Sequence, residues 1–127
     1  MKRGIVTSIV LTGMMLCAVP ARSHHSNVAY EVTKVVTITG VVKEFRWVNP
    51  HTWLHVIVDE NGSKVEYQVE GRAPGVLLRA GWTKTSLKAG EKVTVDMSPA
   101  KDGTKVGIIA RVTKEDGTIL SNQPVLQ

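Results

Sequence analysis

Four histidines are the residues of this 127-residue chain whose type and spacing point most directly to chemistry. Cleavage after Ser23 would leave His24 as a free N-terminus, whose α-amine and ring nitrogen can hold one metal ion together. His25 or His51 would add a third nitrogen. Nitrogen-rich sites of this kind suit Cu(II), Zn(II) or Ni(II), and an oxidising compartment favours copper. The simpler alternative is an unstructured chain end whose histidines bind nothing.

His51 and His55 are four positions apart, a spacing that has different consequences in a helix and in a strand. On a helix the two rings would lie together and chelate one ion. On a strand they lie about 13 Å apart, too far for one ion with bonds of about 2 Å. The simpler interpretation is that both are polar residues of a half-exposed face. They stay candidate metal ligands only together with the start of the exported chain.

A second set of candidates shares the face of the predicted hairpin that points away from the core. The residues expected to contact a ligand there are Trp53, Ile57, Glu66, Gln68 and Glu70. Exposed aromatic and apolar side chains among polar groups are typical of binding surfaces. OB-type barrels bind their ligands across this face. It therefore favours a small apolar ligand or a partner protein, unless the C-terminal segment or a neighbouring subunit covers it.

Charge and motifs argue against two other function classes. The chain has 16 Lys and Arg against 11 Asp and Glu, but three of the cations fall within residues 1–23. The remaining 13 against 11 give a net charge of +2, which argues against nucleic acid as the partner. The sequence has no nucleophile-elbow serine, phosphate-binding glycine loop or helical metalloprotease motif. We therefore expect no enzyme.

Residues 1–23 have the pattern of a bacterial Sec-type signal peptide. Lys2 and Arg3 precede an apolar run over residues 5–19, and small residues at a cleavage site follow. The one cysteine, Cys17, falls inside this segment, so the exported part has no disulfide and no thiolate site. No later apolar run approaches the roughly 20 residues that span a bilayer. We therefore expect a periplasmic or secreted protein, with no membrane insertion after cleavage.

The rest of the chain is dominated by segments of β type. Strands are expected over residues 35–47, 51–59, 64–70, 92–97 and 106–113, with a short edge piece at 118–120. In the first strand the apolar face passes from Ile38 to Val41, and this change across Gly40 predicts a β-bulge there. A short helix is expected over residues 74–79, where a proline suits the first turn and Gly81 ends the helix.

The pair Asn61-Gly62 predicts the register of the central hairpin. A two-residue type I′ turn needs positive φ at both central positions, which this pair tolerates. Paired residue numbers then sum to 123, so that His55 lies opposite Gln68. The core face of the hairpin is then expected to consist of Leu54, Val56, Val58, Val65, Tyr67 and Val69.

The order of elements predicts an all-β, mainly antiparallel fold. Three strands, a short helix and two strands fit a small five-stranded OB-like barrel with the helix between strands 3 and 4. A small sandwich or an SH3-like barrel is the alternative. We expect one domain over residues 24–120, a flexible tail over 121–127, and Trp82 and Leu87 packed over one end of the barrel.

Several segments of the chain are also familiar in combination. Four segments carry this pattern: His24-His25-Ser26, residues 40–51 with the block Trp47-Val48-Asn49-Pro50-His51, residues 76–82 with the run Leu77-Leu78-Arg79 and the pair Gly81-Trp82, and residues 86–93. Together they resemble a family of small exported bacterial proteins catalogued as a domain of unknown function, over residues 24–120. The resemblance implies a secreted single-domain β-barrel and transfers no activity.

Two functional hypotheses follow from these patterns. The first is a non-enzymatic periplasmic binding protein that holds a transition metal, copper first, through its histidine-bearing N-terminus. The second is an accessory interaction module that binds a small apolar ligand or a partner protein on the hairpin face. An undetected hydrolase or isomerase is the third alternative.

Overall fold

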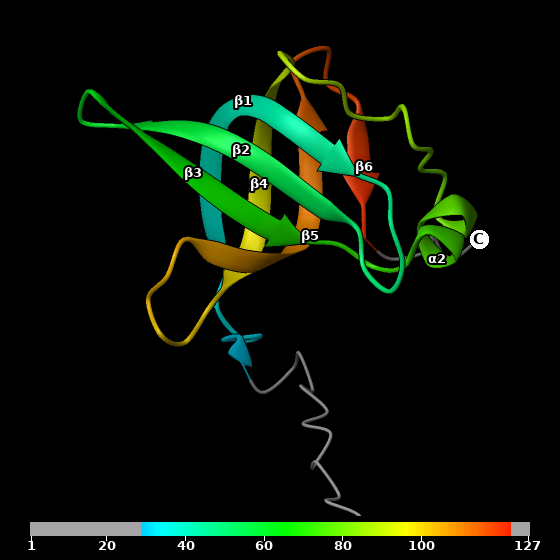
Figure 1. Cartoon of the computed structure of the whole chain (residues 1–127), viewed down its shortest axis with the longest axis horizontal. Coiled ribbons are helices and arrows are strands. Elements are labelled where there is room, and N and C mark those ends of the chain that lie inside the picture. Colours follow the sequence, from blue (N-terminus) through cyan, green and yellow to red (C-terminus); the bar gives the residue numbers. More distant parts are fainter. Residues whose placement is uncertain (1–28, 123–127) are drawn as a thin grey trace, which may run out of the picture.

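Strand-forming sequence makes up most of the domain, and the strands close into a barrel (Figure 1). The computed structural model describes residues 29–122. In chain order the elements are β1 (Val36–Arg46), β2 (Trp53–Glu60), β3 (Ser63–Glu70), α2 (Pro74–Arg79), β4 (Lys92–Pro99), β5 (Val106–Lys114) and β6 (Ile119–Ser121). The expected signal peptide, His24, His25 and the tail beyond residue 122 lie outside the described residues. No helix between residues 29 and 122 has the length and apolar character to cross a membrane.

The strands pair in the order β3-β2-β1-β4-β5-β6, and a further pairing between β3 and β5 closes the ring. Every pairing is antiparallel except this last one, which is parallel and sets Glu70 beside Ile108. The predicted five-stranded OB-like barrel, with its helix between strands 3 and 4, is confirmed; β6 is one extra strand beside β5. In Figure 1, α2 lies at one end of the barrel and the β2–β3 turn projects from the other.

The register of the β2–β3 hairpin is the predicted one. Asn61 and Gly62 have φ values of 54° and 87°, as a type I′ turn requires. His55 pairs with Gln68, and all the other predicted pairs are present. Leu54, Val56 and Val69 are fully buried, Val58 and Tyr67 are 8% and 9% exposed, and Val65 packs partly buried against the core, so the predicted core face is confirmed.

The predicted bulge at Gly40 is wrong. The register between β1 and β2 shifts at Lys43, the extra residue, and the inward side chain is Val42 rather than Val41. Gly40 serves a different purpose, because an added Cβ would overlap the backbone carbonyl of Ile57. The glycine therefore lets β1 approach β2 closely, and the bulge turns the cationic side chain of Lys43 outward.

The segment after β3 covers one end of the barrel, as predicted. Leu77 of α2 and Trp82 are fully buried, and Leu87 is 3% exposed. The indole Nε1 of Trp82 donates a hydrogen bond of 2.7 Å to the backbone carbonyl of Ser121. Ser121 ends β6 and Asn122 is buried, so both belong to the barrel domain and not to the expected tail.

Candidate functional site

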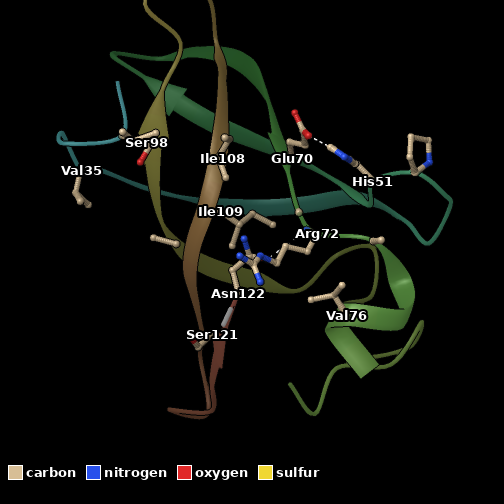
Figure 2. A pocket seen from close by; sticks show the side chains of 15 residues that line it. Val35, His51, Glu70, Arg72, Val76, Ser98, Ile108, Ile109, Ser121 and Asn122 are labelled. Carbon is tan, nitrogen blue, oxygen red and sulfur yellow. Dashed lines mark hydrogen bonds and ion pairs between the residues drawn. The ribbon is translucent and has the colours of Figure 1, made fainter. Parts of the chain in front are cut away.

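A cavity of about 670 Å³ opens where β3 closes the barrel against β5 (Figure 2). Its apolar walls come from the segment before β1, from α2 and from β5, namely Val32, Val35, Val76, Ile108, Ile109 and Ala110. Its main polar lining comes from the loop before β2, the end of β3, the loop before α2 and the residue after β6, namely His51, Glu70, Arg72 and Asn122. Its volume lies within the range of about 300–1,000 Å³ typical of small-molecule sites.

Glu70 is the buried carboxylate of this site, with 7% of its surface exposed. The phenol of Tyr30 donates a 2.9 Å hydrogen bond to Glu70 Oε2, and Nδ1 of His51 contacts Oε1. Burial raises the pKa of Tyr30, and the hydrogen bond to the negatively charged Glu70 raises this pKa further. Tyr30 is therefore a hydrogen-bond donor at neutral pH. The expectation that Glu70 faces solvent is wrong, because Tyr30 covers it.

The contact with Glu70 determines which nitrogen of His51 is available for binding. An ionised carboxylate only accepts hydrogen bonds, so Nδ1 carries the proton of the neutral ring. Nε2 is then free to accept a hydrogen bond or to bind a metal ion. The side chain of His51 is 40% exposed, so a ligand in the cavity has access to it.

His55 repeats this arrangement one step further along the hairpin. Its Nδ1 lies 2.7 Å from Glu66 Oε1, with the same diagonal offset between β2 and β3 that relates His51 to Glu70. Lys43 at the bulge contacts the other oxygen of Glu66 at 2.6 Å. The hydrogen bonds from Lys43 and then from His55 hold the pKa of Glu66 below its usual value. Here the charges are paired, and the side chain of His55 is only 14% exposed.

Arg72 differs from these residues because its charge has no partner in the part of the chain that the structure describes. Its backbone is fixed on both sides: Thr52 Oγ1 donates to its carbonyl at 2.9 Å, and its N–H donates to Asn122 Oδ1 at 3.3 Å. Its guanidinium makes no hydrogen bond or ion pair with any residue from 29 to 122. The backbone is thus held on both sides of Arg72, and its exposed side chain presents to the cavity a cation that no residue from 29 to 122 neutralises.

The structure divides the expected site residues between two surfaces. His51 and Glu70 lie at the cavity, whereas His55 and Glu66 lie on the outer face of the hairpin. Trp53 and Ile57 share this outer face and are half-buried, and Gln68 is exposed. Their role in ligand binding stays a prediction. The part of the chain that the structure describes has no cluster of three His, Cys, Asp or Glu residues able to hold a metal ion.

Three residues were missed in the sequence: Arg72 and Asn122 line the cavity, and Tyr30 holds Glu70, which also lines it. Tyr30 falls in a polar segment and Arg72 in a short loop, while Asn122 was assigned to the tail. A lone aromatic residue in a polar segment was the available signal for Tyr30. For Arg72 and Asn122 there was none, because they meet only when β6 returns to the loop before α2.

Comparison with known proteins adds a family to this description. A search of the curated proteins finds no match. Residues 13–111 match a family described as a family of unknown function (DUF6152), and the match includes most of the strands and α2. It thus extends over well more than half of the 127 residues. The chain therefore belongs to this family of unknown function.

Proposed function

We propose that this chain is an exported, non-enzymatic binding protein whose cavity at the β3–β5 closure holds a small, largely apolar molecule. The cavity itself is the observation that carries the proposal, since its size and mainly aliphatic walls with a few fixed polar groups suit such a ligand. Val32 and Val35 at its edge are 61% and 62% exposed. A bound apolar molecule would remove part of this surface from water, which favours binding.

The polar groups of the cavity support ligand binding. Glu70 holds Nδ1 of His51 and so sets the direction of the ring. His51 is thereby placed to give a ligand one hydrogen bond of defined direction.

The substitution Ala110→Trp tests the proposal, because Ala110 is exposed on β5 and lines the cavity. We expect the wild-type protein to bind the uncharged dye N-phenylnaphthylamine, with a rise in its fluorescence. In the variant the indole should fill the cavity and weaken binding at least tenfold, about 1.4 kcal/mol, without changing the melting temperature. The measurement is a fluorescence titration.

Ala89→Trp is the matched control, since Ala89 is an exposed turn residue that does not line the cavity. It should bind the dye as the wild type does. No binding by the wild-type protein, or equal binding by the Ala110 variant, would contradict the proposal.

Copper binding through the start of the exported chain is a second candidate function, favoured by the contact between His51 and Glu70. Histidines that bind metal ions commonly donate their other ring N–H to a carboxylate, which orients the ring. Tyr30 donates to the same carboxylate and so fixes the start of the described chain near His51. His24 is six residues before Tyr30, a length of chain that spans at most about 20 Å.

Calorimetric titration of the exported form with Cu(II) tests this second function. We expect His51→Ala to weaken binding at least tenfold, and the His24→Ala and His25→Ala variants to do the same. His55→Ala is the matched control, because its ring has the same kind of glutamate partner but lies on the outer face. A dissociation constant above about 10 μM, or one that is insensitive to His24 and His25, would rule copper out.

A further inference from the structure

We infer that the cavity selects an aliphatic monocarboxylate, whose carboxylate binds the guanidinium of Arg72 and whose alkyl chain lies along β5. This inference rests on the proposed binding function of the cavity and adds the chemical class of the ligand. It is carried by the charges that line the cavity, by the fixed backbone of Arg72 and by the apolar surface beside it.

Within residues 29–122, the charge of the cavity that has no partner is positive. The ionisable residues of this range that line the cavity are His51, Glu70 and Arg72. Glu70 has both oxygens engaged, one by Tyr30 and one by His51, so it offers little attraction to a ligand cation. Arg72 has no anionic partner anywhere in the described range. A ligand with a single negative charge would complete the pairing.

The backbone of Arg72 is held in place before any ligand arrives, and its exposed side chain extends from this fixed point. Hydrogen bonds from Thr52 and to Asn122 fix the backbone on both sides of its Cα. Figure 2 shows Arg72 and Asn122 together at the cavity, beside Ile109. Since Oδ1 of Asn122 accepts from the Arg72 N–H, its amide NH₂ group is left as a further donor. A planar guanidinium binds a carboxylate through two parallel hydrogen bonds, so this position suits a carboxylate well.

The walls beside Arg72 suit an alkyl chain. Ile108 of β5 is half-buried and Val76 of α2 lines the same cavity, whereas Ile109 is a core residue that is only 1% exposed. Val32 and Val35, both largely exposed, extend this aliphatic surface to the edge. Burial of apolar ligand surface here adds about 25 cal/mol per Å² to the binding free energy, before the cost of ordering the ligand.

Three probes of equal chain length and different charge test the inference: octanoate, octanol and octylamine. In calorimetric titrations, we expect octanoate to bind at least tenfold more tightly than octanol, and octylamine to bind most weakly. Arg72→Gln should reduce the affinity for octanoate at least tenfold and leave that for octanol unchanged. Arg79→Gln is the matched control, since Arg79 is an exposed arginine of α2 that does not line the cavity. The Arg72 side chain has no partner among the described residues to lose, so the melting temperature should not change.

The outcomes separate this inference from the proposed function. Equal affinities for octanoate and octanol, both lost in Ala110→Trp, would overturn the charge selection and leave a general apolar site. Preference for octylamine would overturn it too, because Glu70 would then govern binding. Octanoate binding that Arg72→Gln does not weaken would show that the carboxylate lies elsewhere. No binding of any probe, with no binding of the naphthylamine dye, would overturn both proposals.

Discussion

Replacement of Glu70 by alanine is expected to lower the free energy of unfolding by about 2–4 kcal/mol. The substitution removes the acceptor of two hydrogen bonds, one from the buried phenol of Tyr30 and one from His51. The Tyr30 hydroxyl would then lie in the interior without a partner, which costs more than the hydrogen bond itself contributes. Urea unfolding followed by fluorescence gives the change.

A double-mutant cycle with Tyr30→Phe separates the phenol contact from the other effects of losing Glu70. We expect a coupling energy of about 1–3 kcal/mol between the two positions, because a phenylalanine has no hydroxyl group that would lose its hydrogen-bond acceptor when Glu70 is removed. In the Glu70 variant the pKa of Tyr30 should also fall part of the way to its ordinary value, because burial remains while the carboxylate is gone. Additive effects of the two substitutions, with an unchanged Tyr30 titration, would contradict this account of the site.

Replacement of Trp82 by alanine is expected to have the larger effect, about 3–5 kcal/mol. The indole is fully buried, its ring centroid lies 5.9 Å from that of Phe45, and it covers one end of the barrel. Its Nε1 also holds Ser121, the residue before Asn122 in the cavity wall. We therefore expect Trp82→Ala to weaken dye binding as well as stability, measured by chemical unfolding and by the fluorescence titration.

Trp82→Phe is the control that distinguishes packing from the hydrogen bond. It keeps an aromatic ring in the core and removes the Nε1 donor, so we expect a smaller loss of about 1–2 kcal/mol. If Trp82→Ala cost less than about 1 kcal/mol, the segment after α2 would not be a structural part of the barrel end.

The central hairpin shows what could be predicted from the sequence. Alternation of apolar and polar residues determines which face of a strand is buried, and a two-residue Asn-Gly turn determines the register. Both are local, so the pairing of His55 with Gln68 followed from the printed residues alone. The helix over residues 74–79 was predicted for the same reason, from Pro74 at its start.

The bulge in β1 was misplaced because its cause is not local. Gly40 interrupts the sequence pattern, but it does so to let the carbonyl of Ile57 approach. The change of face occurs at Lys43, where a charged side chain cannot stay inside. A sequence shows that a strand changes face, whereas the packing of two strands decides at which residue.

The sequence by itself determined the barrel class, the order of its strands, the core face of the hairpin and the outward direction of His55. It did not determine the candidate site, whose parts come from both ends of the chain and from the middle. Glu70 and Asn122 are far apart in sequence, and the parallel closure of β3 against β5 with the return of β6 brings them to one cavity, where Tyr30 from the segment before β1 holds Glu70. The physical reason is that secondary structure follows from neighbouring residues, while a buried hydrogen-bond network and an unpaired charge depend on which distant side chains share one space.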